Sequence, residues 1–371
     1  MKGHFHIFGL GLALFHLAFN IYIAVWLAFR LKLQPKGRFI VYEAALLLSA
    51  FYPAARVFAA SRFGGFADAM LWPAFFSFGI SFIFFWVLLV CDLALSALKA
   101  MGAGWAWSRP VFIAVLGAAI IFSGLAAWSG GQTPRLKRIE VAVSNLPAAL
   151  DGFTIVQISD LHLGRMIKLK RLEKIAGIIK GLKPDLVVFT GDFSESREPM
   201  PEGTCGVIKG ITALYGKAAV LGNHDMFTGG EPAAAFFNNC GVKMLRGTVY
   251  EPAPGLLVAG VDDLRRGDGA AVRKLAAVLD RSKPLLFLSH QPQGFDEITA
   301  AGSGLVLSGH THKGQIFPFG PLERHMFKYF YGLYKAGGFS IYVTSGAGAW
   351  GPPLRLFADS ELPLFTLRSG V

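Results

Sequence analysis

The chain has 371 residues, a formal net charge of +12 and a mean hydropathy of +0.47. The charge does not indicate nucleic-acid binding, because much of it flanks apolar stretches and residues 131–371 contain no long basic block. The high hydropathy comes mainly from residues 1–130, which are suited to a different solvent from the rest of the chain.

Four apolar stretches in residues 1–130 are long enough to cross a membrane as helices. Residues 7–29, 69–91 and 111–128 carry no charge. Residues 39–60 form the weakest of the four, since Glu43, Pro53 and Arg56 lie within them. Charges near helix ends can still reach the membrane surface. We therefore expect a helical membrane domain of about four spans over residues 1–130, and an integral protein of a bacterial inner membrane.

The orientation of these spans depends on the basic residues between them. The connection over residues 30–38 carries four of them, and Lys99 and Arg109 lie in the third connection. If both connections lie in the cytoplasm, residues 131–371 lie outside it. Arg56, Arg62 and residues 135–138 favour the reverse. We favour the external arrangement. Cys205 and Cys240 could pair, but nothing in the sequence shows that they do.

Five short apolar runs in the second part of the chain are typical of buried parallel strands. They are rich in Val, Ile, Leu and Phe and stop at Gly, Ser or Asp. They occupy residues 154–158, 185–189, 218–221, 284–288 and 304–307. Residues 131–371 therefore predict an α/β domain that is long enough to bury a large core.

A polar cluster follows each of these runs. Ligands gather where the strands of α/β sheets end, so we expect the clusters to converge. Five of the nine histidines lie in them. The clusters are S-D-L-H at 159–162, T-G-D at 190–192, G-N-H-D at 222–225, S-H-Q-P at 289–292 and G-H-T-H at 309–312.

The donor types in these clusters are those of a site for two divalent metals. Carboxylate, amide oxygen and imidazole suit Mn, Fe or Zn better than Ca or Mg. No Cys lies in the clusters, which argues against a thiolate zinc site. Asp192 has two carboxylate oxygens and could bridge both ions. A water between the ions would be acidified to hydroxide and would attack phosphorus.

The ordered series D-x-H, G-D, G-N-H-D, H and G-H-x-H resembles the calcineurin-like metallophosphoesterases over residues 139–371. The resemblance implies two packed β-sheets flanked by helices. It also implies the role of each residue. His224 would protonate or stabilise the leaving oxygen, and Asp225 would orient His224. Asp160, His162 and His312 would hold the first metal, Asn223, His290 and His310 the second, and Asp192 would bridge them.

The C-terminal tail resembles a narrower branch of that family. H-T-H-K-G-Q-I at 310–316, V-T-S-G-A-G at 343–348 and P-P-L-R-L at 352–356 are similar to membrane-anchored YkuE/YaeI-like phosphoesterases. The layout is also similar to that of the vertebrate transmembrane protein with metallophosphoesterase domain. The branch implies UDP-2,3-diacylglucosamine as one candidate substrate, which would need a cytoplasmic active site.

Two segments outside the clusters bear on the substrate. Residues 317–336 mix aromatic and basic side chains, which suits either a membrane interface or an ordinary packed helix. Arg265 and Arg266 could bind a phosphate group, although loop charges with no such role are commoner.

Three hypotheses of function follow. The first is a membrane-bound di-metal phosphohydrolase that cleaves a phosphodiester or pyrophosphate in a lipid or lipid precursor. The second is a phosphatase or diesterase of soluble envelope nucleotides, with the helices as an anchor. The third is a membrane sensor whose phosphoesterase domain is regulatory. The partners expected are the phospholipid membrane and a lipid-linked or nucleotide-type substrate, with no nucleic acid and no obligate protein partner evident.

Overall fold

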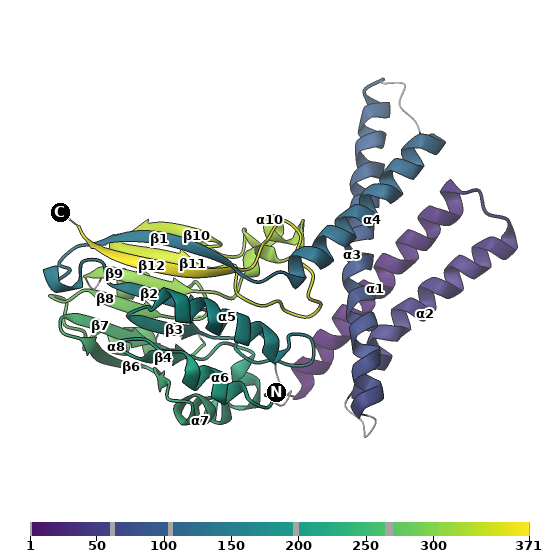
Figure 1. Ribbon diagram of the computed structural model, residues 1–371. Helices are drawn as coiled ribbons and strands as arrows, with labels where there is room; N and C mark the ends of the chain where they lie inside the picture. Colours follow the sequence, from purple (N-terminus) through teal and green to yellow (C-terminus); the bar gives the residue numbers. More distant parts are fainter. Residues whose placement is uncertain are drawn as a thin grey trace. The chain divides into compact units, whose positions relative to one another are not determined.

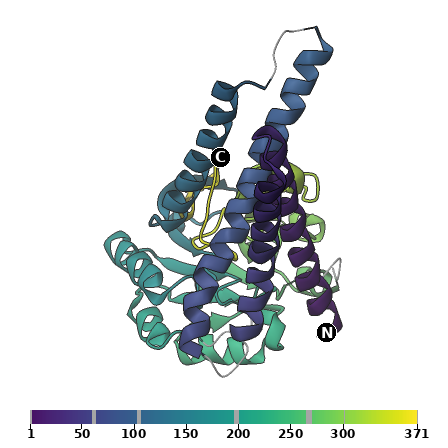
Figure 2. The same ribbon diagram turned by 90° about the vertical axis from the view of Figure 1, so that its right-hand side faces the viewer.

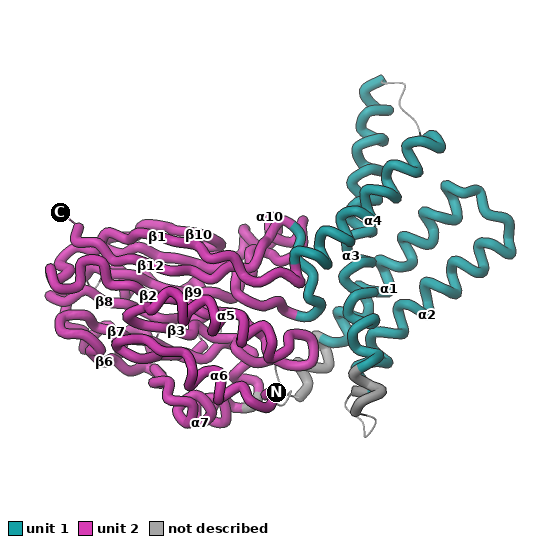
Figure 3. The backbone as a smooth tube through the Cα atoms, in the orientation of Figure 1, with its two compact units in different colours: residues 1–129, 351–356 teal, residues 130–350, 357–371 magenta. Residues whose placement is uncertain are grey.

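The computed structural model describes residues 2–59, 64–102, 107–195, 200–263, 270–300 and 302–370. They form two compact units (Figure 3). The helical unit contains residues 1–129 together with residues 351–356. The α/β unit contains residues 130–350 and 357–371. No pattern in the sequence indicates that residues 351–356 group with the helices.

Within the described residues, four helices are long and apolar enough to cross a membrane, as predicted. The helices α1, α2 and α3 pack against one another (Figures 1 and 2). The helix α4 joins α1 and α3 through a small core that contains Trp26, Leu88 and Val115. The four are α1 (Lys2–Arg30), α2 (Pro35–Ala59), α3 (Gly64–Ala100) and α4 (Arg109–Gly131).

The helix α3 extends nine residues beyond the predicted end of its span at Cys91. Asp92 is the first charged residue after that span. In the structure Arg30 of α1 forms a salt bridge of 2.8 Å with Asp92, and the Tyr22 hydroxyl donates to the same carboxylate at 2.7 Å. Pairing reduces the cost of placing a charge on a helix close to the apolar region.

One buried amide links three of the helices. The Asn20 side chain in α1 donates to the Ser49 hydroxyl in α2 at 3.1 Å and accepts from the Ser81 hydroxyl in α3 at 2.8 Å. By contrast, large apolar side chains such as Phe29 (72% exposed) and Leu47 (70%) point outwards from the helices. An apolar outer surface around polar interhelical contacts is the pattern of helices solvated by lipid.

The α/β unit contains two six-stranded mixed sheets. The first sheet has the order β1 (Arg135–Val143), β12 (Glu361–Ser369), β2 (Thr154–Ile158), β3 (Leu186–Thr190), β4 (Lys217–Val220) and β5 (Lys243–Met244). The second has the order β10 (Gly332–Ala336), β11 (Gly338–Val343), β9 (Ser303–Ser308), β8 (Leu285–Leu288), β7 (Leu256–Gly260) and β6 (Thr248–Ala253).

Each of the five predicted runs forms a strand, and the runs divide between the two sheets. Strands β2, β3 and β4 are parallel neighbours in the first sheet, and β8 and β9 are parallel neighbours in the second. The sheets pack face to face through side chains such as Ile155, Val188, Val258 and Leu286. The predicted fold class, with a helical membrane part and a two-sheet α/β part, is confirmed.

Helices cover the outer faces of both sheets (Figure 1). Both faces of the central strands are therefore buried, which explains why their sequences are continuously apolar. On the first sheet lie α5 (Leu169–Leu182), α6 (Thr204–Gly210) and α7 (Glu231–Asn239). On the second lie α8 (Ala270–Ala276) and α9 (Asp296–Thr299). The short helix α10 (Phe319–Glu323) follows the last polar cluster.

The two cysteines of the α/β unit form a disulfide. Cys205 lies in α6, and Cys240 lies directly after α7, with their Cα atoms 5.2 Å apart. The sequence left this pairing open, because 35 residues separate the two positions. The disulfide fastens two neighbouring helices on the outer face of the first sheet.

Candidate metal centre

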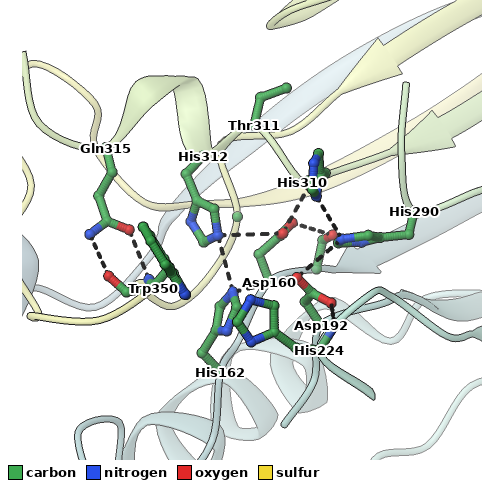
Figure 4. Close-up of polar contacts among 12 residues, drawn as sticks. Asp160, His162, Asp192, His224, His290, His310, Thr311, His312, Gln315 and Trp350 are labelled. Atoms are coloured by element: carbon green, nitrogen blue, oxygen red, sulfur yellow. Dashed lines mark hydrogen bonds and ion pairs between the residues drawn. The ribbon is translucent and has the colours of Figure 1, made fainter. Parts of the chain in front are cut away.

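The polar clusters meet in space because the strands that precede them are aligned. Asp160 and His162 follow β2, Asp192 follows β3, and the clusters at 222–225, 289–292 and 309–312 follow β4, β8 and β9. The two sheets place these strand ends together, so that histidines and carboxylates from distant parts of the sequence face one another (Figure 4).

The first group of possible metal ligands contains Asp160, His162 and His312. One ligand atom from each lies within 4.8 Å of the others. The Nε2 atoms of His162 and His312 are 3.1 Å apart, and His312 Nε2 is 3.5 Å from Asp160 Oδ1. All three side chains are buried. This is the set that the family resemblance assigned to the first metal.

The second group contains Asp192, His290 and His310, again with ligand atoms within 4.8 Å of one another. His290 Nε2 lies 3.1 Å from Asp192 Oδ2 and 3.2 Å from His310 Nδ1. Asp192 Oδ2 is also 3.8 Å from His162 Nε2 of the first group. The Asp192 carboxylate therefore lies between the two groups, as a bridging ligand must.

The unsatisfied polar atoms fit a divalent cation. Asn223 Oδ1 is buried and has no hydrogen-bond partner among the described residues. His290 Nδ1 is 2.9 Å from the Thr190 carbonyl, and a donated hydrogen bond there would leave Nε2 as the free ligand atom. Burial is the main cause that raises the pKa of Asp160, and a bound cation would reverse this effect. The buried donor set is suited to metal binding.

The His224 ring has a carboxylate partner that the sequence did not predict. The family resemblance implied that Asp225 would orient His224. In the structure, the Asp225 carboxylate accepts hydrogen bonds from the backbone amides of Gly222 at 3.0 Å and Ser194 at 3.1 Å. It therefore fastens the loops after β3 and β4. The carboxylate that contacts the His224 ring, at Nδ1 and 3.1 Å, belongs to Glu195.

Glu195 is the functional candidate that the sequence analysis missed. Its other oxygen lies 3.1 Å from His162 Nδ1, so one carboxylate supports both a metal-ligand candidate and the proposed acid. Its position three residues after Asp192 was the only available signal. Burial opposes ionisation of Glu195, but hydrogen bonds from His162 and His224 outweigh it and lower its pKa to about 2.

The surroundings of His224 favour its protonated form. Burial lowers its pKa, but the negative charges of Asp192 and Glu195 outweigh this effect and raise the pKa to about 9. A neighbouring protonated imidazole can donate to a leaving oxygen at neutral pH.

Glycines let the clusters approach one another. A Cβ at Gly222 would overlap the Asp192 carboxylate, and one at Gly309 would overlap Asp160 and Ser159. The backbone of five candidate ligands lies in the left-handed region of φ/ψ space, which non-glycine residues seldom adopt. Such backbone strain is common at functional sites. The φ angles are 52° at Asp160 and His162, 49° at Asp192, 74° at His310 and 48° at His312.

The loop after β11 closes against the first ligand group. The Gly348 amide donates to the Asp160 carbonyl at 2.9 Å, and a Cβ at Gly348 would overlap the Leu161 carbonyl. Further along, Trp350 exchanges two backbone hydrogen bonds of 2.8 Å with the Gln315 side chain. The Trp350 ring lies edge-on to the His224 ring, with centroids 6.4 Å apart.

The segment 317–336 has two kinds of aromatic residue. Tyr329 is 7% exposed and packs on Phe295 and Tyr334, while the Tyr331 hydroxyl donates to Glu361 at 3.0 Å. Both side chains are therefore held by contacts within the α/β unit. The exposed large apolar side chains of the segment are Phe317, Phe319, Leu322, Met326 and Leu333.

Two further polar features complete the surroundings. Glu323 Oε2 is buried without a hydrogen-bond partner among the described residues. Burial and the charge of Asp160 raise the pKa of Glu323 to about 8. The predicted phosphate-binding residues Arg265 and Arg266 lie outside the described residues.

Comparison with known proteins identifies relatives across most of the chain. Residues 153–314 match the model of the calcineurin-like phosphoesterase family. The uncharacterized metallophosphoesterase YkuE of Bacillus subtilis is 35% identical, over 61% of this chain and 82% of that protein. An uncharacterized metallophosphoesterase of Aquifex aeolicus is 31% identical, over 70% and 98%. The transmembrane protein with metallophosphoesterase domain of Danio rerio is 30% identical over 74% of this chain, which spans 65% of that relative's length.

Proposed function

The chain belongs to the calcineurin-like phosphoesterase family, and on that premise we propose a membrane-anchored phosphohydrolase that acts on a lipid or lipid precursor through two divalent metals. The main support for this type of reaction is the convergence of two groups of buried carboxylates and imidazoles around Asp192. The bond cleaved is a phosphodiester or a pyrophosphate.

The residue roles follow from their positions. Asp160, His162 and His312 would hold one ion, Asn223, His290 and His310 would hold the other, and Asp192 would contribute to both. Divalent Mn, Fe or Zn at these ligands would neutralise phosphate charge and acidify water. His224 donates a proton to the leaving oxygen, and Glu195 holds its imidazole in the required orientation through the contact at Nδ1. Asp225 supports the loops that carry these groups.

Exposed apolar side chains close to the ligands support a lipid substrate. Phe317, Phe319, Leu322 and Met326 are 47–76% exposed and begin five residues after His312. Exposed aromatic and aliphatic side chains on short amphipathic segments insert into the boundary between headgroups and acyl chains. This surface would hold the apolar part of a substrate whose phosphate reaches the metals.

The test changes these four exposed residues to Ser and compares two substrates. Turnover of a lipid-linked diphosphate in liposomes is expected to fall sharply, while hydrolysis of a small soluble diester stays unchanged. Tyr329→Ser is the matched control, because Tyr329 is buried and should affect both activities alike. Equal loss on both substrates in the fourfold variant would assign the segment to core packing, and no loss on either would exclude a lipid-facing role.

The disulfide supports an external active site. Disulfides such as Cys205–Cys240 persist in oxidising compartments and are rare in the cytosol. The basic residues of connection 30–38 and the pair Lys99 and Arg109 favour the same orientation. We therefore infer a substrate that presents its phosphate on the non-cytoplasmic face. UDP-2,3-diacylglucosamine, which needs a cytoplasmic site, fits this orientation less well than a lipid-linked diphosphate.

A cavity favours the second candidate function, hydrolysis of soluble envelope nucleotides. It has a volume of about 240 Å³ and is lined by residues 292–296 and 326–329. Phe327 in its wall lies 5.6 Å from the His310 ring, measured between ring centroids. A mixed polar and aromatic cavity beside a metal ligand suits a base or a sugar. Phe327→Ala would raise KM for nucleotide diesters and leave lipid turnover unchanged if this function is the correct one.

A further inference from the structure

The proposed proton donor His224 lies between aromatic rings of the α/β unit. The Phe227 ring meets the imidazole edge-on, with centroids 5.3 Å apart and planes at 82°. The Trp350 ring meets it in the same way, with centroids 6.4 Å apart and planes at 72° (Figure 4). Phe227 belongs to the turn Asp225–Thr228 after β4, and Trp350 to the loop after β11. Two loops of one unit therefore place aromatic rings beside the group that would protonate the leaving oxygen.

The backbone of Trp350 is fixed by one side chain. The Gln315 side chain donates from Nε2 to the Trp350 carbonyl and accepts at Oε1 from the Trp350 amide, both at 2.8 Å (Figure 4). Gln315 is 9% exposed, and its own backbone amide donates to the His312 carbonyl at 3.1 Å. The Trp350 loop is also fastened at Gly348, whose amide donates to the Asp160 carbonyl at 2.9 Å. The position of Trp350 is thus tied to two metal-ligand candidates.

Packing in the core does not account for the Trp350 ring. Trp350 is the only tryptophan in residues 130–371 and is 38% exposed. Within the part of the chain that the structure describes, it belongs to none of the apolar clusters that form the core of the α/β unit. A large aromatic side chain stabilises a fold mainly when it is buried. A partly exposed ring, held by its backbone beside a reactive group, is suited to contact a ligand.

We propose that Trp350 determines specificity for the leaving group, because its ring packs against the group whose oxygen takes the proton of His224. It favours a rigid ring, aromatic or sugar, over a small alkyl group. This inference deepens the proposed function and rests on it, since it takes His224 as the proton donor. Aromatic side chains stack on flat rings, and a contact with one leaving group but not another changes the ratio of their kcat/KM values.

The chemical step itself is that of the proposed function. Hydroxide bonds to phosphorus, and the bond from phosphorus to the leaving oxygen breaks with its electron pair on that oxygen. The oxygen then takes the proton of His224. Trp350 moves no proton in this step and contributes only through its contact with the departing group.

An internal competition tests the proposal. Benzyl methyl phosphate carries two leaving groups whose alcohols have similar acidity, so the release of benzyl alcohol or methanol reports which group is chosen. The ratio of the two alcohols does not depend on the fraction of the enzyme that is folded or loaded with metal. The full chain in detergent should release benzyl alcohol in roughly 3–10-fold excess, the size of one aromatic contact. Trp350→Ala should bring the ratio close to one, and Trp350→Phe should keep most of the preference.

Two further variants examine the support of the ring. Gln315→Ala should lower the ratio towards that of Trp350→Ala, because both hydrogen bonds to the Trp350 backbone are lost. Phe357→Ala is the matched control: this aromatic residue of the α/β unit is 63% exposed, and its ring contacts Phe317. It should leave the ratio unchanged. Cyclohexylmethyl methyl phosphate distinguishes the two kinds of ring, since a retained preference indicates a sugar-like apolar face and a lost preference indicates an aromatic ring.

Equal release of the two alcohols by the unmodified chain would overturn the proposal, as would an unchanged ratio in Trp350→Ala. If the chain cleaves only diphosphates, an equimolar mixture of benzyl diphosphate and methyl diphosphate gives the ratio through its products. A chain that hydrolyses neither phosphoesters nor diphosphates would instead overturn the proposed function, which separates the two failures.

Discussion

Glu195 lies 3.1 Å from Nδ1 of His224, and its second carboxylate oxygen lies 3.1 Å from Nδ1 of His162. One half-buried carboxylate thus joins the proposed proton donor to a metal-ligand candidate. Residues that orient metal ligands through the second imidazole nitrogen commonly change metal affinity or activity when they are replaced.

Glu195→Gln should lower kcat about 10–100-fold, because the amide no longer fixes both imidazoles as a charged acceptor. Asp225→Asn should act differently, because the Asp225 carboxylate accepts hydrogen bonds from backbone amides. We expect a lower Tm and a smaller change in kcat per folded molecule. Steady-state kinetics and thermal unfolding of the two variants make the comparison. A larger kcat defect for Asp225→Asn would return the orienting role to Asp225.

His224→Ala should retain bound metal and lower kcat by roughly 100-fold or more, the usual size of a general-acid contribution. The defect should shrink on substrates with a good leaving group such as nitrophenolate, which needs no proton. Kinetics on a nitrophenyl and an alkyl diester measure this difference. Equal defects on the two substrates would remove His224 from the acid role.

Asp192→Asn should lose both metal and activity, because the Asp192 carboxylate lies between both ligand groups. Elemental analysis of the unmodified protein, purified without chelator, should find two equivalents of Mn, Fe or Zn, and EDTA should abolish diester hydrolysis. Full activity in a protein shown to be metal-free would contradict the metal-dependent mechanism.

Glu323→Gln should alter how stability depends on pH. The pKa of Glu323 is raised from 4.5 to about 8, so the folded protein keeps a proton that the unfolded chain releases above its ordinary pKa. The free energy of unfolding of the unmodified protein therefore falls, relative to the variant, as pH rises from about 4.5 to about 8, by at most ~1.4 kcal/mol per pH unit. Unfolding of both proteins in detergent with chelator measures the difference.

Glu173 is exposed on α5 and offers the matched control for that experiment. A Glu173→Gln variant should follow the unmodified protein throughout the range. A Glu323→Gln variant whose stability also runs parallel to the unmodified protein would show that Glu323 titrates normally.

Reporter fusions after Trp128 should be active outside the cytoplasm, and fusions within residues 30–38 inside. The physical reason is the retention of basic connections in the cytoplasm. In intact cells Cys205 and Cys240 should react with a thiol reagent only after reduction, since they form a disulfide. Cytoplasmic reporter activity after Trp128 would reverse the orientation and restore cytoplasmic lipid precursors as substrates.

The sequence by itself determined the elements and the ligand types. The apolar length of α1 to α4 and the continuous Val, Ile, Leu and Phe runs of β2, β3, β4, β8 and β9 are local patterns, because each reflects the solvent on the faces of its own element. Asp160, His162 and the other cluster residues were recognisable because each follows such a run at a fixed place.

The tertiary structure alone decided which side chains meet. Asp225 and Glu195 are both carboxylates near a cluster, and only the packing of the loops after β3 and β4 shows that Glu195 contacts His224. Likewise, nothing in the composition of residues 351–356 indicates that Leu354 fills the space left by Gly79. Such contacts join residues distant in sequence, and their geometry depends on the assembled fold, which no local pattern of hydrophobicity or spacing encodes.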